Sequence, residues 1–573
     1  MSAQTGVAPP SGPVSQRIVD RAKYQVDRLK DEPNPIWIRE LKQAARLART
    51  PIVLMVVAVL MTLLMASIGG IMSTTSAPAD TGVVLFHVFF SLAFFVVVLI
   101  GPAVAANSIA SEREGRTWEA VILTGMRPGE VARGKFFAAY TAIGMYIVML
   151  APVGALPFLF GGVTATETIV AFVFLFLIAL LGVAFGLAIS SKMASLRAAI
   201  LVTLLLAFPL SITAFSSFGP GLSIAAHKAW PAVPEGPPIW LPSAYARAPF
   251  GLTYVVFLFL LPVAAVALPA WFLYEVTIAN LTSVTDDRST GLKRWFLVAA
   301  PVVTVAAALP LVGVDPADHD DVAIAGVCAA VTFFSFCTFL FSGEPIGPSR
   351  RVRAMWDRAR AGRFRRYLGP GIMRASSLVM IATLASLGAL AGFALLWILR
   401  AAHTSADDQL AKVLVFSGYA IGFMVFVIGF AAFVRSRAST ALVTRVLLFT
   451  VLFGVAIGPW IVAAIAGLLA NNLGRDALVI AAPSPFYAFV MVDSIKRGGD
   501  TAIGVGIAMA AAYAVLGLVL VGAAGRRCSR IIRKHEQALA EAERLLAEED
   551  AALAAQPTAA AAPAPESEAP RTA

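Results

Sequence analysis

The sequence GVVLFHVFFSLAFFVVVLIGPAVAA, residues 82–106, decides the fold class. It holds 25 residues, and none of them is Asp, Glu, Lys or Arg. A helix of about 20 apolar residues crosses the hydrocarbon core of a bilayer and pairs its backbone N–H and C=O groups within itself. A stretch of this length and composition therefore predicts a membrane-spanning helix.

Eleven more apolar stretches of similar length lie on either side of this one. The chain of 573 residues is 59% hydrophobic and only 14% charged, which exceeds what a soluble core could bury. The sequence therefore predicts an all-α polytopic membrane protein with about 12 transmembrane helices. The expected spans are 51–72, 82–106, 136–160, 165–190, 196–216, 251–277, 295–314, 321–341, 376–400, 411–433, 443–470 and 502–524.

The positive charges follow the order of these spans. Lys and Arg number 45 against 34 Asp and Glu, a net charge of +11 that on a soluble domain would suggest nucleic acid. Here the basic residues concentrate in alternate loops, whereas the loops at 73–81, 161–164 and 315–320 hold no Lys or Arg. By the positive-inside rule the basic loops are cytoplasmic. We therefore expect an integral multi-pass protein of a prokaryotic-type cytoplasmic membrane, with both termini in the cytoplasm, lipid contacts and no nucleic-acid partner.

The second six spans repeat the spacing of the first six, displaced by about 240 to 250 residues. Short strings agree with this offset, such as Pro242-Ser243 and Pro483-Ser484. Because six is an even number, both halves would insert the same way up, as two parallel six-helix repeats. The expected segments are a cytoplasmic N-terminal segment 1–33, an interfacial helix 34–50, a first half 51–277, a cytoplasmic linker 278–294, a second half 295–524 and a cytoplasmic tail 525–573, helical and then disordered.

Two segments near the first spans carry the most information about function. In NPIWIRELKQ, residues 34–43, Trp37 and Leu41 share one helical face while Arg39 lies elsewhere, as in a helix lying in the membrane interface. In SEREGRTWEAVILTGMRPG, residues 111–129, Ser111 can cap a helix with Glu112 in its first turn, running to residue 123. Such a helix can dock a soluble partner, although charged loops of this kind are also ordinary solvated surfaces.

Both segments resemble type-2 ABC exporter permeases, which carry a similar Asn-Pro and Arg-Glu-Leu helix before the first span and a Ser/Glu-rich loop before the third. The resemblance covers most of residues 34–525. The sequence departs from it by inserting Arg116 and by placing Gly125-Met126 where the family often has Pro. The matching residues in the loop and the following span are Ser111, Glu112, Glu114, Gly115, Thr117, Glu119, Leu123, Thr124, Gly134 and Lys135.

The resemblance implies the permease subunit of an exporter rather than an enzyme. It would bind no cofactor itself, and ATP and Mg would be held by a separate ABC ATPase subunit, in two copies, that drives an unidentified substrate across the membrane. The residues implied in coupling to the ATPase are Glu112, Arg113, Glu114, Arg116, Thr117 and Glu119, and those of the interfacial helix are Trp37, Arg39 and Glu40.

One string imitates a nucleotide site. The residues from Gly129 to Lys135, GEVARGK, fit the first seven positions of a phosphate-binding loop, but Phe136 replaces the Ser or Thr that would hold Mg²⁺. No buried strand precedes it, so we reject it as a nucleotide site. No spacing of His, Cys, Asp and Glu suggests a metal site.

The loop before the ninth span is different in kind, because eight Arg residues between 350 and 366 face only Asp357. Two interpretations remain open: an orientation signal that contacts anionic lipid headgroups, or a second surface for the ATPase. Its candidate residues are Arg351, Arg358 and Arg363.

Two other classes of function remain possible, a twelve-span secondary carrier and a membrane scaffold. Ion-driven carriers retain charged groups within the membrane where those groups work. The apolar runs hold almost none, with His87 and Glu275 as the exceptions, which argues against a carrier.

Overall fold

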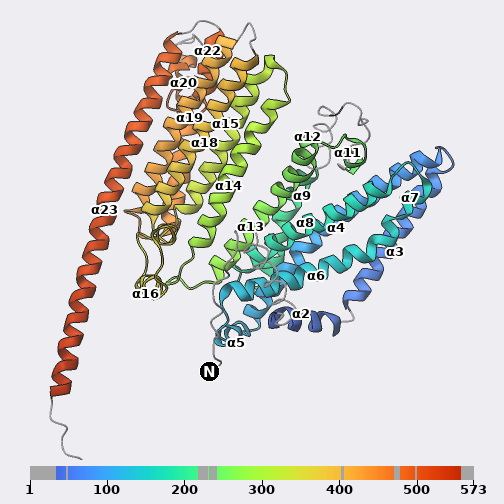
Figure 1. Cartoon of the computed structure of the whole chain (residues 1–573), viewed down its shortest axis with the longest axis horizontal. Helices are drawn as coiled ribbons and strands as arrows, with labels where there is room; N and C mark the ends of the chain where they lie inside the picture. Colours follow the sequence, from blue (N-terminus) through green and yellow to red (C-terminus); the bar gives the residue numbers. More distant parts are fainter. Residues whose placement is uncertain are drawn as a thin grey trace, which may run out of the picture. The chain divides into compact units, whose positions relative to one another are not determined.

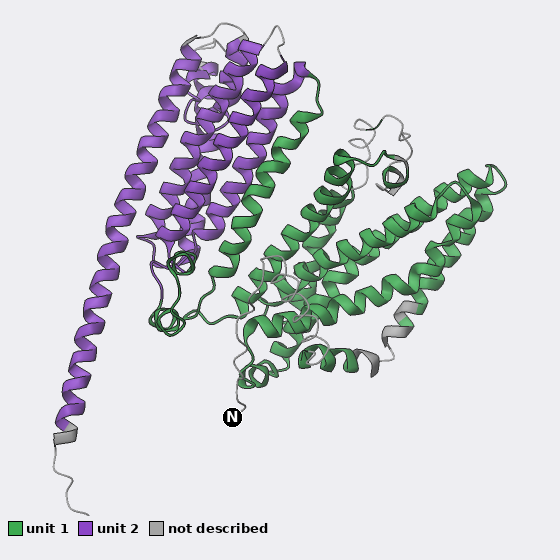
Figure 2. Cartoon of the chain, in the orientation of Figure 1, with its two compact units in different colours: residues 1–315, 349–369 green, residues 316–348, 370–573 purple. Residues whose placement is uncertain are grey.

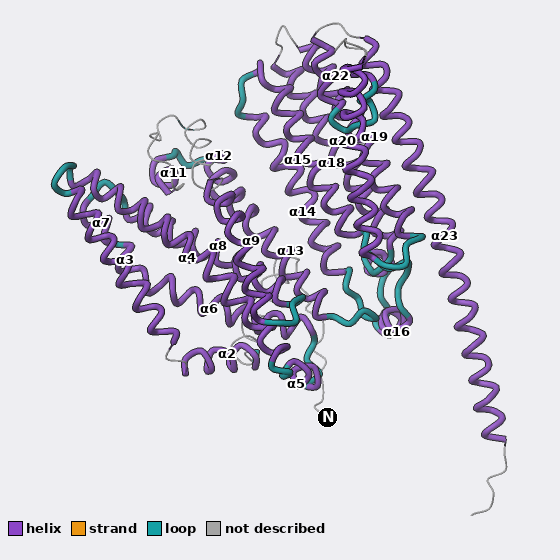
Figure 3. Tube along the Cα trace, turned by 180° about the vertical axis from the view of Figure 1, so that it is seen from behind, coloured by secondary structure: helices purple, strands orange, loops and turns teal. Residues whose placement is uncertain are grey.

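The computed structural model describes residues 34–46, 49–216, 230, 242–401, 406–469, 478–496 and 500–555. This described part is helical and contains no strand (Figure 3). Within it, twelve helical segments are long and apolar enough to cross a membrane. The predicted all-α polytopic membrane protein is therefore confirmed. The expected N-terminal segment 1–33 and the end of the tail beyond residue 555 lie outside the described residues.

The chain divides into two compact units (Figures 1 and 2). Unit 1 comprises residues 1–315 and 349–369, and unit 2 comprises residues 316–348 and 370–573. The helices of unit 1 are α2 Pro35–Arg46, α3 Arg49–Met72, α4 Pro78–Glu114, α5 Trp118–Leu123, α6 Pro128–Gly154, α7 Leu156–Phe160, α8 Ala165–Ser190, α9 Leu196–Ser216, α11 Pro242–Arg247, α12 Leu252–Tyr254, the π-helical η2 Val255–Leu260, α13 Leu261–Leu281, α14 Thr290–Ala308, η3 Leu309–Val312, α16 Arg350–Arg358 and α17 Arg363–Tyr367. Those of unit 2 are η4 Pro316–Asp318, α15 His319–Phe341, α18 Ile372–Ala401, α19 Ala406–Arg435, α20 Ala441–Leu469, α22 Tyr487–Lys496 and α23 Asp500–Ala555.

The division between the units differs from the expected division at the linker 278–294. Helix α14, the first span of the expected second half, belongs to unit 1. Its Trp295 ring lies 4.8 Å from the ring of Phe272 in α13, and the Trp295 indole donates to the carbonyl of Leu268 over 2.9 Å. The buried Lys293 of α14 also donates to the carbonyl of Gly369 over 2.7 Å. These contacts tie both α14 and the segment 349–369 to unit 1.

Helix α8 lies at the centre of unit 1. It packs against α4, α6, α9, α11 and α13. Phe89, Phe90 and Phe94 of α4 are fully buried in the surrounding core. Gly186 lets α8 approach α4 closely, because a Cβ at this position would overlap the carbonyl oxygen of Pro102. Small residues supply such close contacts in membranes, where lipid tails are as apolar as the side chains.

Helix α19 holds the same place in unit 2. It packs against α15, α18, α20, α22 and α23, and it is the most thoroughly buried of the twelve candidate spans. Gly422 and Gly429 lie against the backbone of α23, where added Cβ atoms would overlap the carbonyl oxygens of Ala510 and Gly517. The centre of each unit is thus the fourth span in the predicted order of its half.

A short helix precedes the sixth span of each predicted half, and a tyrosine holds each short helix in place. Tyr245 of α11 donates its hydroxyl to the carbonyl of Leu258 in η2. Tyr487 of α22 donates to the carbonyl of Ala502 in α23 over 3.2 Å. In both units a phenol hydroxyl therefore joins the short helix to the first turns of the span that follows.

Helix α23 is continuous over 56 residues. The helical part expected at the start of the tail 525–573 is therefore an extension of the last span rather than a separate element. Figure 1 shows α23 continuing past the ends of the other unit 2 helices.

We expect Gly429→Ala to destabilise unit 2, because the new methyl group must push α23 away from α19. Overpacking of this kind costs about 1–3 kcal/mol. Gly454→Ala in α20 is the matched control, because no heavy atom lies within 4 Å of its added Cβ. The measurement is the temperature at which the detergent-solubilised protein loses its monodisperse peak; equal midpoints for the two variants would contradict the packing described above.

Candidate functional site

At the end of unit 1 that carries the loops 115–127, 191–195 and 282–289, α2 lies against the start of α6. Asn34 begins this contact: its Oδ1 accepts from the backbone N–H of Ile36 over 3.0 Å, and its Nδ2 donates to the carbonyl of Glu130 over 2.8 Å. Pro35 at the first helical position suits the start of a helix, where its missing N–H is not needed. Gly134 permits the close approach, because a Cβ there would lie 2.5 Å from Asn34 Oδ1 and 2.8 Å from Ile36 Cβ.

The next residue, Lys135, is completely buried. Its Nζ lies 3.1 Å from Glu40 Oε1 of α2 and 3.1 Å from Glu112 Oε1 of α4, and it donates to the carbonyl of Ser108 over 2.8 Å. A buried ammonium is stable only when it is paired and hydrogen-bonded in this way. The three helices are therefore held together through one side chain.

Arg39 completes the group. Its guanidinium lies 3.0 Å from Glu40 and also contacts the carboxylate of Glu112. Burial lowers the pKa of Arg39, but the hydrogen bonds and charges of the two carboxylates outweigh burial and raise it above its ordinary value. We call Arg39, Glu40, Glu112 and Lys135 the ionic junction.

The predicted helix start at Glu112 is wrong. Ser111 to Glu114 form the last turn of α4, and the Ser111 hydroxyl donates back to the carbonyl of Asn107 over 2.6 Å instead of capping a new helix. The chain then turns through Gly115 and Arg116, whose φ of 56° is left-handed, and α5 begins only at Trp118. Helix α4 therefore runs on from its apolar span through the charged residues up to Glu114, because charged side chains that reach water do not terminate a helix.

Three other predicted coupling residues, Arg113, Glu114 and Thr117, hold this turn in place, whereas Arg116 and Glu119 are exposed. Arg113 donates to the carbonyl of Met193 over 3.3 Å, and its guanidinium carbon lies 5.6 Å from the centroid of the Trp118 ring. The carboxylate of Glu114 accepts from the N–H of Leu196 over 2.7 Å, at the N-terminus of α9, where a negative charge is favourable. Thr117 donates to the carbonyl of Glu112 over 3.3 Å.

Helix α5 has a buried and an exposed face. Val121 is buried with Ile36 and Val131, whereas Ile122 and Leu123 are 60% and 85% exposed. The exposure of this pair was not predicted, although a helix cannot place four consecutive apolar residues, AVIL at 120–123, on one face. We define the α5 surface as the exposed residues Glu119, Ile122 and Leu123 of α5 together with the exposed Arg116 of the preceding turn.

The string that imitates a phosphate-binding loop has a structural explanation. Its Gly134 and Lys135 are the residues against which α2 packs and on which the ionic junction centres. They are therefore occupied by contacts within the chain.

The arginine-rich segment forms α16 and α17, held through the buried Val352 and Trp356. Arg351 lies 3.0 Å from Asp286 of the preceding loop. Arg358 and Arg363 are exposed. These contacts involve α14 and the loop 282–289 and not the residues of the ionic junction.

One charged pair within the candidate spans was missed. Asp320 of α15 and Lys412 of α19 are both buried, and they form an ion pair of 2.5 Å. Gln409 flanks the pair and donates to the carbonyls of Pro316 and Ala317 over 2.9 and 3.0 Å. The pair was missed because Asp320 is one of several Asp residues just before an apolar run, and its partner lies 92 residues further along the chain.

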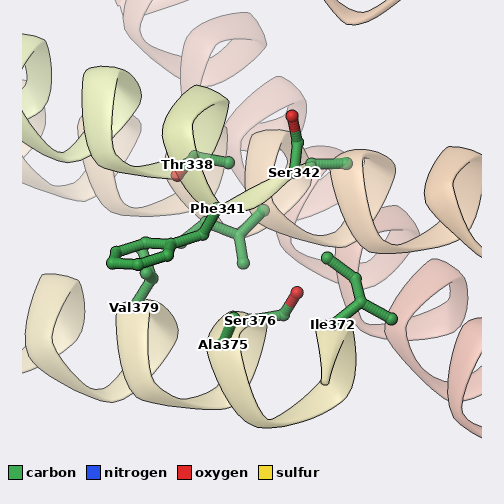
Figure 4. A pocket seen from close by; sticks show the side chains of 9 residues that line it. Thr338, Phe341, Ser342, Ile372, Ala375, Ser376 and Val379 are labelled. Carbon is green, nitrogen blue, oxygen red and sulfur yellow. The ribbon is translucent and has the colours of Figure 1, made fainter. Parts of the chain in front are cut away.

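The described residues line one small cavity and two larger grooves. A cavity of about 10 Å³ between α15 and α18 lies beside Thr338, Ser342 and Ser376 (Figure 4), and it has room for about one water molecule. Larger grooves lie along α19 and α23 in unit 2, about 430 Å³, and along α6, α8 and α13 in unit 1, about 330 Å³.

Comparison with protein-family models finds no match to this chain, and no curated protein or solved structure matches it.

We expect Lys135→Met to destabilise the protein strongly, because it leaves Glu40 and Glu112 without their shared cation. Breaking a buried pair in this way costs about 3–5 kcal/mol. Lys192→Met, at an exposed lysine of a neighbouring loop, is the control and should change little. The measurement is again the thermal midpoint in detergent. Adding Glu40→Gln and Glu112→Gln to Lys135→Met should recover part of the loss; no recovery would argue against an electrostatic role for Lys135.

Proposed function

We propose that this chain is the membrane subunit of a type-2-like ABC exporter, whose ATP is bound and hydrolysed by a separate ATPase chain. The observation that carries the proposal is the combination of the ionic junction with the α5 surface. A short helix presents exposed apolar and charged side chains, while the residues around it are fixed to α2, α4 and α6 by buried ion pairs. A soluble partner that binds α5 would therefore transmit a force to the membrane-spanning helices, because α5 is not a free loop.

The contacts indicate how a displacement of α5 would be transmitted to α2, α4 and α6. Val121 packs α5 against Ile36 of α2 and Val131 of α6. The turn Gly115–Thr117 joins α5 directly to α4, and Lys135 joins α4 to α2 and α6. Separating α2, α4 or α6 from the other two would leave a buried charge unpaired, at a cost of about 3–5 kcal/mol, whereas α5 is held by Val121 and the short turn. We therefore infer that α2, α4, α5 and α6 move as one body.

The packing within each unit supports the proposed two-half repeat. The fourth span of each half, α8 or α19, packs on the second, third, fifth and sixth spans and on the short helix. The tyrosine bonds of α11 and α22 to the following span correspond in the same way. The halves would differ at the ATPase side, where the first offers α5 and the second the arginine-rich α16. In this proposal the basic loops are cytoplasmic, ATP and Mg reside on two ATPase copies, and the transported substrate is unidentified.

The proposal is tested by affinity purification of the full chain from gently solubilised membranes of its native cell. We expect an ABC ATPase chain to co-purify in stoichiometric amount and to be lost with Leu123→Asp or Glu119→Lys, both of which alter exposed positions. Val284→Asp is the control, an equally exposed apolar residue (81%) of the loop 282–289. Recovery of the wild-type chain without any ATPase would refute the proposal and favour a membrane scaffold.

A secondary carrier is the second candidate, and the buried Asp320–Lys412 pair is the observation that favours it. Paired charges within membrane segments mark the proton or ion pathway of many carriers. This pair lies near the first residues of α15 and α19, at the ends of the spans. The neighbouring Gln409 donates hydrogen bonds to the carbonyls of Pro316 and Ala317, just before α15. Those features fit a structural clamp better than a relay at the bilayer centre.

Proteoliposomes adsorbed on a solid-supported membrane separate the two candidates. We expect no transient current when the external pH is stepped in the absence of ATP. A current that is present in the wild-type protein and abolished by Asp320→Asn, while Asp318→Asn leaves it unchanged, would instead establish a proton-coupled carrier.

A further inference from the structure

The groove of unit 1 combines an apolar lining with a single positive charge. It has a volume of about 330 Å³, within the range of small-ligand sites. Helices α6, α8 and α13 form its walls. Its lining residues are Arg133, Phe136, Phe137, Leu180, Ala267, Ala270, Trp271 and Tyr274.

The charge stands at one end of the groove. Arg133 is the sixth residue of α6, and Tyr274 is seven residues before the end of α13, so at about 1.5 Å per residue they lie roughly 8 and 10 Å from the basic helix ends. Ala267 lies roughly 21 Å from the same end. The groove therefore runs from the depth at which lipid headgroups meet their acyl chains toward the middle of the membrane.

Arg133 is free to bind an anion. It is exposed, and within the described part of the chain it forms no ion pair. Two carboxylates of the lining helices lie near this end of the groove. Glu130, three residues before Arg133 in α6, accepts over 3.3 Å from the backbone N–H of the residue before the helix. Glu275 of α13 accepts from the Trp271 indole with its Oε1 over 3.1 Å. Its Oε2 lies against Gly291, at the start of α14, where the helix dipole favours a negative charge. Neither carboxylate is part of the lining or forms an ion pair with Arg133, so the positive charge of Arg133 is left uncompensated.

We propose that this groove binds an anionic phospholipid, with the lipid phosphate on Arg133 and one acyl chain along Phe136, Phe137 and Trp271. Basic pockets between transmembrane helices bind anionic headgroups in this manner. An acyl chain suits the rest of the lining, which is apolar and aromatic. A free phosphate ion would find only Arg133 there, so the groove selects the lipid rather than the soluble anion. This proposal is independent of the proposed transport function.

Native mass spectrometry of the detergent-purified full chain tests the proposal, with phosphatidylglycerol as the probe. We expect one phosphatidylglycerol molecule to remain bound under conditions that remove phosphatidylcholine, and inorganic phosphate not to displace it. Arg133→Ala should weaken retention about fivefold, which corresponds to roughly 1 kcal/mol for one basic residue at the membrane surface. Arg127→Ala removes the same charge from an exposed residue outside the groove and should have no effect.

A second pair of variants tests the acyl-chain part of the groove without changing its charge. Ala267→Trp fills the groove and should reduce phosphatidylglycerol retention, whereas Ala265→Trp, an exposed position of the same helix that does not line it, should not. Equal retention of phosphatidylcholine and phosphatidylglycerol by the wild-type chain would overturn the proposal, because it would show only general lipid adhesion. Unchanged retention in Arg133→Ala would overturn it as well, and we expect this variant to fold because Arg133 is exposed.

Discussion

The ammonium group of Lys135 has no contact with water, and this constraint organises one end of unit 1. Its charge must be balanced by carboxylates, and these come from α2 and α4. Arg39 shares both carboxylates, so that two cations and two anions close a compact group. Removing any one of them changes the balance for the other three. The position of α2 follows from this group and not from its apolar face alone.

In the membrane-spanning part of each unit, the packing of the helices is determined by the surrounding lipid. Lipid offers no hydrophobic drive for two apolar helices to associate, so close backbone approach and hydrogen bonds must hold them. Gly186 of α8 provides the close approach to α4, and Gly429 of α19 provides the close approach to α23. The hydroxyl of Ser190 in α8 provides a bond between helices, since it donates to the carbonyl of Ala106 over 2.6 Å. The most buried helix of each unit carries these contacts.

The sequence predicted the fold class well because a bilayer converts length and composition directly into helices. Residues 82–106 contain all the information that their span requires. The sequence near a charged or polar side chain gives no such signal for which residue it will pair with. Nothing near Asp320 reveals that Lys412, 92 residues away, neutralises it, and nothing near Ser111 shows that its hydroxyl bonds backward within α4. At the candidate site, the residues of the ionic junction could be named from the sequence, whereas their mutual contacts and the outward direction of Leu123 depend on tertiary packing.

The length of α23 has a consequence for local stability. Its side chains are exposed almost throughout from Arg533 to Ala552, so this part of the helix gains little from tertiary burial. Its order depends on local terms such as the Arg544–Glu548 ion pair of 2.8 Å, a type worth about 0.2–0.5 kcal/mol. A helix supported in this way opens and closes independently of the membrane-embedded part. Its amide hydrogens would therefore exchange with solvent long before those of residues 501–525, although both stretches belong to one unbroken helix.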